Sequence, residues 1–159
     1  MKKLLKYILF ILAVVALDQW TKWIVVENIP LYGHVDFLPG FLGFTYTKNI
    51  GAAWSMLSGQ QWLLVLVFAV LSALLLVEYF KFRMPFSGLE RWFIAAIYAG
   101  GLGNVIDRVR LGYVVDMIQT EFMDFPIFNV ADCFITCGCF LLIAHMIFLN
   151  KEFWKEEKK

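Results

Sequence analysis

The chain has 159 residues, of which 61% are hydrophobic and 18% aromatic, and its formal net charge is +1. Water-soluble domains are closer to half apolar, so this composition indicates a single-domain integral membrane protein. The small net charge gives no reason to expect nucleic acid as a partner. An odd number of cysteines, three, argues against a disulfide framework.

Four apolar segments are candidates for crossing a bilayer. The clearest is a run of 20 residues at positions 61–80, interrupted only by Glu78, and such a helix spans about 30 Å, one hydrocarbon core. A basic start before an apolar run is also typical of a cleavable signal peptide, but the first run continues through Trp20 and Trp23. We therefore expect four transmembrane helices, at residues 7–26, 61–80, 92–107 and 130–149.

The basic residues predict how these helices are oriented. Three lie in the first six residues, three at 81–91 and four after residue 150, which is ten of the 14 in the chain. Four spans place these segments on one side, and short loops rich in Lys and Arg stay in the cytoplasm. Both termini are therefore expected to be cytoplasmic, with the segments at 27–60 and 108–129 outside.

The outer segment at 27–60 is expected to contain a small β-hairpin. Pro39 and Gly40 fit a type II turn, with glycine where φ must be positive. The flanking residues, 35–38 and 41–47, are rich in β-branched and aromatic side chains. Aromatic residues concentrate at the headgroup layer, so this hairpin is an interfacial anchor, a platform beneath an acylated substrate, or both.

Carboxylates gather between the third and fourth spans. An ionised side chain inside a bilayer costs about 2.5 kcal/mol or more, so such groups usually pair, face water or function. Asp116 follows the third span and Asp132 lies in the first turn of the fourth, which places both at the outer interface. Two carboxyl groups that share a proton can hydrolyse a peptide bond, one as base on water and one as acid on the carbonyl.

Structural roles for the same acids remain open alternatives. Asn129 is a good helix N-cap, and Asp132 would complete a capping box with it. Asp116 could be a solvated loop acid, and Asp107 could form a local ion-pair cluster with the neighbouring Arg108 and Arg110. Asp18 and Lys22 are four residues apart on one helix face and are expected to neutralise each other.

Other chemistries have weaker support in the sequence. Ser55, Ser58 and Lys48 would suit a Ser-Lys protease, although serine is ordinary in an outer loop. His145 lies about 20 Å along the helix from Asp132 and is too distant to join it. The cysteines at 133 and 137 could bind a metal but are expected to be buried small hydrophobes. The glycines at 100, 101 and 103 lack the setting of a nucleotide loop and are expected to allow close helix packing.

Four sequence blocks occur in order along the chain: DQWTK at 18–22, TKNIGAAW at 47–54, GNVIDR at 103–108 leading to VVD at 114–116, and FNVAD at 128–132. Together they resemble the lipoprotein signal peptidase family, the type II signal peptidases of bacteria. The resemblance covers nearly the whole chain. It implies an all-α membrane protein with four transmembrane helices and an extracytoplasmic β-hairpin or cradle between the first two.

The resemblance also implies an activity and a site. The family consists of aspartic endopeptidases of the bacterial inner membrane, which remove the signal peptide just before the diacylglyceryl-modified Cys of prolipoproteins. Their site lies near the outer face, needs no cofactor or metal, and is blocked by cyclic peptides of the globomycin type; membrane lipid is the other expected partner. Asp116 and Asp132 match the catalytic pair. The positions matching supporting or substrate-binding residues are Asn49, Gly51, Asn104, Asp107, Arg108, Asn129, Asp18 and Lys22.

Two functions of other classes stay as alternatives. A small transporter or channel subunit would use intramembrane acids to relay protons or cations, but here the acids cluster at one end. A non-catalytic assembly factor would use the same acids only for capping and pairing.

Overall fold

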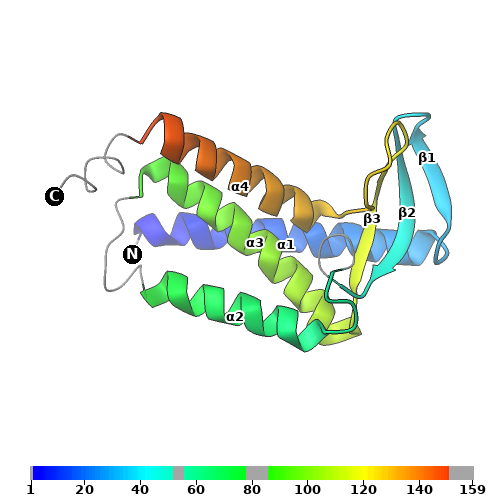
Figure 1. Ribbon diagram of the computed structural model, residues 1–159, viewed down its shortest axis with the longest axis horizontal. Helices are drawn as coiled ribbons and strands as arrows, with labels where there is room; N and C mark the ends of the chain where they lie inside the picture. Colours follow the sequence, from blue (N-terminus) through cyan, green and yellow to red (C-terminus); the bar gives the residue numbers. More distant parts are fainter. Residues whose placement is uncertain (1, 52–55, 78–85, 151–159) are drawn as a thin grey trace.

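The computed structural model describes residues 2–51, 56–77 and 86–150, which form a bundle of helices with an antiparallel sheet at one end (Figure 1). Ser55, the end of the second expected span at 78–80, the basic residues at 81–85 and the charged tail lie outside the described residues. The described elements are α1 (Lys2–Asn28), β1 (His34–Leu38), β2 (Leu42–Asn49), α2 (Gln61–Val77), α3 (Gly88–Leu111), β3 (Val114–Thr120) and α4 (Val130–Phe148).

Helix α3 contacts each of the other three helices, and glycines make these contacts close. A Cβ on Gly100 would overlap the backbone oxygen of Ala131 in α4, and one on Gly101 would lie 2.5 Å from the ring of Phe68 in α2. A Cβ on Gly103 would lie 2.6 Å from an Asp18 carboxylate oxygen in α1. The expected role of these glycines in close helix packing is therefore confirmed.

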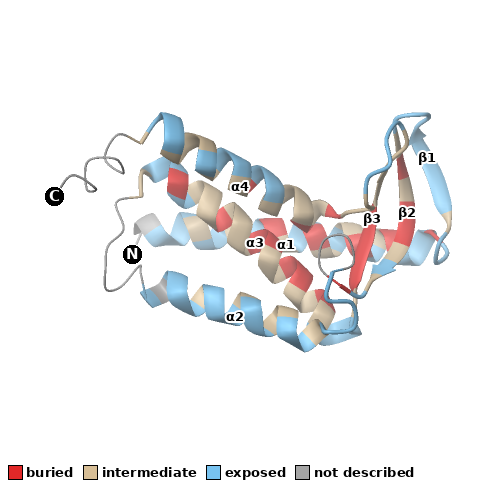
Figure 2. Cartoon of the chain, viewed as in Figure 1, coloured by how far each residue is buried: buried red, intermediate tan, exposed pale blue. Residues whose placement is uncertain are grey.

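The outer surface of the bundle is apolar. Figure 2 shows that buried residues gather where α1, α3 and β3 meet, while much of α2 is exposed. Among the described helices, α1 from Leu4 and α4 are long and apolar enough to cross a membrane, and α2 is apolar but shorter. Helix α3 carries Asp107, Arg108 and Arg110 in its last turns. All four helices therefore exist close to their expected positions, and four membrane crossings remain a proposal.

The sheet differs from the expected hairpin because it has a third strand. The turn is as expected: the Phe41 amide donates to the Leu38 carbonyl at 2.9 Å, and Gly40 has a φ of 74°. However, β3 pairs with β2 on the side away from β1, giving the order β1-β2-β3. The cradle is therefore not built only between the first two helices, and part of the segment expected to be an outer loop is a strand.

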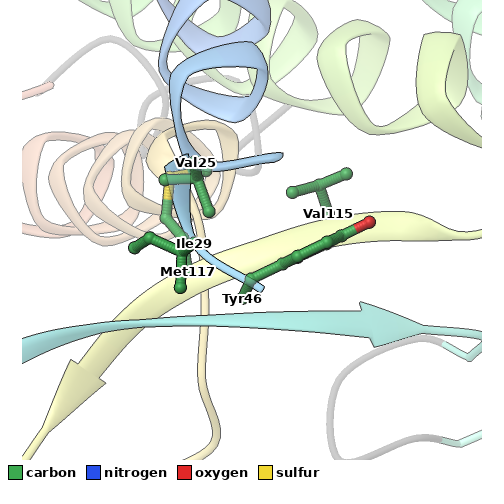
Figure 3. Close-up of a cluster of buried hydrophobic side chains, with 5 residues drawn as sticks. All are labelled: Val25, Ile29, Tyr46, Val115 and Met117. Atoms are coloured by element: carbon green, nitrogen blue, oxygen red, sulfur yellow. The ribbon is translucent and has the colours of Figure 1, made fainter. Parts of the chain in front are cut away.

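The last turn of α1 and the residue that follows it hold the sheet in place. Val25 and Ile29 pack against Tyr46 of β2 and against Val115 and Met117 of β3, forming the small apolar cluster in Figure 3. Burying such side chains contributes about 1.5–3 kcal/mol each. The contact fixes the sheet to the end of the bundle, close to where α3 ends.

A second connection brings the start of α4 to β3. The amides of Met117 and Ile118 both donate to the Phe128 carbonyl, at 2.9 and 2.7 Å, and the Phe128 amide donates back to Ile118 at 3.1 Å. The segment after β3 thus returns alongside it. As a result Asn129, the next residue in the chain, lies beside Asp116.

Candidate active site

Asp116 is buried in β3 and held by two amide side chains. It is only 2% exposed, so the alternative of a solvated loop acid is wrong. The Nδ2 atoms of Asn49 and Asn129 donate to its two oxygens at 2.9 and 2.7 Å. In the β2–β3 pairing Thr47 lies opposite Asp116, so Asn49, two residues further along β2, is a diagonal neighbour.

Asp132 occupies the third position of α4 and completes a capping box with Asn129. The Asp132 amide donates to Asn129 Oδ1 at 2.9 Å, and the Asn129 amide donates to Asp132 Oδ2 at 3.2 Å. The other oxygen, Oδ1, accepts from Asn104 Nδ2 at 2.8 Å. The predicted cap is therefore confirmed, and it also fixes the direction of the Asp132 carboxylate.

The two carboxyl groups meet around Asn129, whose side chain binds Asp116 while its backbone binds Asp132. Burial and, to a smaller extent, the nearby charge of Asp132 raise the pKa of Asp116 from 3.8 to about 7, against the opposing effects of the Asn49 and Asn129 hydrogen bonds and of the Lys22 charge. Near neutral pH this pair can therefore hold one proton between two carboxyl groups, which is what acid–base catalysis by a carboxyl pair requires.

A buried ion cluster lies beside the pair. The Lys22 ammonium donates to Asp18 Oδ2 and Asp107 Oδ2, each at 2.9 Å, and to Asn104 Oδ1 at 3.0 Å. The three N–H groups of the ammonium thus meet three acceptor oxygens. The expected Asp18–Lys22 pair is confirmed. Among the described residues the ion pair of Asp107 is with Lys22, so the expected local cluster with Arg108 and Arg110 is wrong.

Asn104 connects this cluster to the carboxyl pair. Its Oδ1 accepts from Lys22 and from Asn129 Nδ2, the latter at 3.1 Å. Because lysine only donates, it fixes which end of the Asn104 amide faces it. The Nδ2 end is then directed at Asp132, so Lys22 positions that carboxylate through Asn104.

Arg108 supports the other side of the site. Its Nη2 donates to the Gly51 carbonyl at 2.7 Å and its Nη1 to the Asn104 carbonyl at 3.2 Å. The Gly51 amide in turn donates to Asn49 Oδ1 at 2.9 Å. This contact directs Asn49 Nδ2 toward Asp116. All ten residues expected at the site therefore belong to one connected hydrogen-bonded network.

Three further contacts were not expected from the sequence. Gln19 Nε2 donates to Asp107 Oδ1 at 2.8 Å and to the Gly103 carbonyl at 3.2 Å. The Ala131 amide donates to Asp18 Oδ1 at 2.9 Å, which anchors the first turn of α4. The sequence feature that could have identified Gln19 as a site residue was its amide side chain inside an apolar run, beside Asp18.

The residues of the rival chemistries lie elsewhere. Lys48 is exposed, with its ammonium 4.6 Å from the centre of the Tyr113 ring. His145 Nδ1 is 3.0 Å from the buried carboxylate of Glu90, near the start of α3. The three thiols are free, and Cys137 is exposed rather than buried. In the part of the chain that the structure describes, the side chains spaced to hold a metal ion are His34, Asp36 and Glu121 on the sheet.

The fold is that of a bacterial membrane enzyme. A solved structure described in those words superposes with a TM-score of 0.85 and is 34% identical, covering 92% of this chain and 90% of its own. The family model described as signal peptidase (SPase) II matches residues 10–148, and the chain belongs to this family.

Two named relatives agree with that assignment. The lipoprotein signal peptidase of Enterococcus faecalis is 43% identical, covering 98% of this chain and 95% of the relative. That of Lactococcus lactis subsp. cremoris is 45% identical, covering 96% and 99%.

Proposed function

We propose that the chain is an aspartic endopeptidase that removes signal peptides from diacylglyceryl-modified prolipoproteins, with Asp116 and Asp132 as its catalytic residues. Membership of the signal peptidase II family and the names of its relatives support the reaction. The observation that supports the catalytic assignment is that both carboxyl groups accept hydrogen bonds from one residue, Asn129. None of the comparisons supports a transporter or channel subunit.

The geometry supports different catalytic roles for the two acids. Ionised Asp132 takes a proton from a water molecule, whose oxygen attacks the scissile carbonyl, while protonated Asp116 donates a hydrogen bond to the carbonyl oxygen. When the carbon–nitrogen bond breaks, the proton on Asp132 passes to the leaving amine. Asn49, Asn104 and Asn129 hold both carboxyl groups in place, so little reorganisation accompanies the reaction.

The position of the pair suits a substrate anchored in lipid. The site lies between the helices and the sheet, at the end of the bundle away from the start of α1 (Figure 1). Phe37 and Phe41 of the β1–β2 hairpin are exposed and suited to the headgroup layer. We place this end at the outer face of the bacterial inner membrane, where an acylated prolipoprotein presents its cleavage site.

The assignment is tested by amide replacement of each acid. Asp116→Asn and Asp132→Asn are each expected to lower cleavage of a diacylglyceryl-modified prolipoprotein at least about 100-fold, the usual contribution of a positioned acid or base. Cleavage is measured by gel shift with full-length protein in detergent micelles. Asp124→Asn is the matched control because Asp124 is an exposed acid between β3 and α4. Wild-type turnover by either site variant, with its helix content intact, would exclude the proposed mechanism.

A further inference from the structure

We propose that His34, Asp36 and Glu121 form a binding site for a divalent cation of the Zn²⁺ class, on the polar face of the sheet. The three residues are separate from the network of Asp116 and Asp132. Two come from β1 and one directly follows β3. The proposal therefore does not depend on the proposed peptidase chemistry.

The spacing of the donor atoms fits one ion. His34 Nε2 lies 3.0 Å from Asp36 Oδ1 and 3.2 Å from Glu121 Oε1, and one ligand atom from each residue lies within 4.8 Å of the others. Zinc binds imidazole nitrogen and carboxylate oxygen at about 2.0–2.2 Å, so adjacent ligands of a tetrahedral site lie about 3.3–3.6 Å apart, a few tenths of an ångström more than these two distances. One imidazole and two carboxylates are ligand types that such an ion binds, with the remaining positions left to water.

The hydrogen bonds around His34 Nδ1 leave the other ring nitrogen, Nε2, free to bind a cation at the site. The Thr45 hydroxyl donates to Gln119 Oε1 at 2.5 Å, so its oxygen is the acceptor for His34 Nδ1 at 2.7 Å. The proton of the neutral ring is therefore on Nδ1, and the Nε2 lone pair faces the two carboxylates. Metal-binding histidines are typically held this way, with the second nitrogen donating to a fixed acceptor.

A proton on Nε2 would not satisfy the cluster. It would bond to Asp36 Oδ1, while Glu121 Oε1 is buried and has no hydrogen-bond partner among the described residues despite its closeness to the ring. The other oxygen of Glu121 accepts from the Gly40 amide at 2.7 Å, which fixes the carboxylate. Leaving a buried acceptor without a partner is unfavourable, and a cation can contact all three ligands at once.

The sheet provides the space for this site through a glycine. Gly43 of β2 lies opposite Asp36 of β1 and Gln119 of β3, in the middle strand. A Cβ at this position would lie 2.5 Å from Glu121 Oε1 and 2.8 Å from His34 Nε2. The missing side chain lets groups from the two outer strands meet across β2. A bound cation would therefore tie the edge strand β1 to the end of β3.

The test is a Zn²⁺ titration of the full-length, chelator-treated protein in micelles, read by NMR of the histidine rings. The chain has only two histidines, so the ring signals are few and His145 serves as an internal reference. We expect the His34 signals to shift and saturate at one equivalent while those of His145 stay unchanged. Zinc held instead by the free thiols of α4 would leave His34 unmoved and would overturn the proposal.

Variants separate a cation site from an ordinary imidazolium pair. Glu121→Gln and Gly43→Ala are each expected to weaken Zn²⁺ binding at least about tenfold, whereas Asp124→Asn, which removes an exposed acid nearby in sequence, leaves the affinity unchanged. Circular dichroism establishes that each variant is folded. If the His34 signals do not respond to Zn²⁺, or respond equally in the folded Glu121→Gln variant, the site does not exist.

Discussion

Lys22 joins three side chains of the polar network, Asp18, Asp107 and Asn104. It is 3% exposed and makes contact with two carboxylates and one amide. Buried charges of this kind add little net stability, because desolvation offsets most of the attraction. Their value here is geometric, since Lys22 orients Asn104 and Asn104 orients Asp132. The sequence predicted the pairing of Lys22 with Asp18, because they share a helix face, but not the contact with Asp107, which depends on how α1 and α3 pack.

The raised pKa of Asp116 predicts a pH dependence of stability. Because the folded-state pKa is about 7 and the ordinary value is 3.8, the folded protein keeps a proton that the unfolded chain has lost between these values. The contribution of Asp116 to the free energy of unfolding should therefore be largest below about pH 4 and fall by up to ~1.4 kcal/mol per pH unit as pH rises to 7. We expect the thermal midpoint of the wild type in micelles to fall over this range.

The same measurement on variants isolates the contribution of Asp116. In Asp116→Asn the decline should be smaller, since that position no longer titrates, while Asp124→Asn should follow the wild type. Curves of equal slope for Asp116→Asn and the wild type would show that the Asp116 carboxyl ionises in the ordinary range.

At the scale of elements, the sequence predicted the helices and the turn, which depend on neighbouring residues, but not the third strand, which depends on a distant partner. The helices could be predicted to within a few residues because apolar runs of that length are a local property, and Pro39-Gly40 identified the turn between β1 and β2. Strand β3 was missed because Asp116, with Glu121 and Asp124 close by in the sequence, made its segment look like a polar loop. Its partner, β2, is nearly 70 residues earlier, with Thr47 opposite Asp116, and no local pattern records that pairing.

The glycines of α3 provide a test of packing with a matched pair. Gly100→Ala places a methyl group against the backbone of Ala131, which cannot move without shifting the first turn of α4, so we expect a loss of about 1–3 kcal/mol in stability and reduced cleavage. Gly101→Ala meets only the ring of Phe68, which can rotate, and alanine favours a helix by up to about 1 kcal/mol. Its thermal midpoint should stay close to wild type. Equal effects of the two substitutions would mean that backbone contact with α4 is not what limits residue size at position 100.

At the scale of the whole molecule, the sheet and the carboxyl pair lie at one end, and the start of α1 and the end of α4 lie at the other (Figure 1). In the sequence, the basic residues are concentrated in the segments that adjoin these helix ends. This pattern predicts that the second end of the molecule faces the cytoplasm. Exposed apolar residues cover the helices between the two ends, as a surface in contact with lipid requires. This predicted orientation would place the pair at the outer interface.

Cysteine labelling tests the orientation directly. In a background with Cys133, Cys137 and Cys139 replaced by alanine, Asp124→Cys adds a thiol near the sheet, and Leu89→Cys adds one at the exposed start of α3. A membrane-impermeant maleimide should label position 124 in intact cells and position 89 only after the membrane is opened, because charged reagents do not cross the hydrocarbon core. Variants that still cleave prolipoprotein serve as the control for correct insertion. The reverse labelling pattern would place Asp116 and Asp132 on the cytoplasmic side, where they could not reach a signal peptide whose cleavage site lies at the outer face.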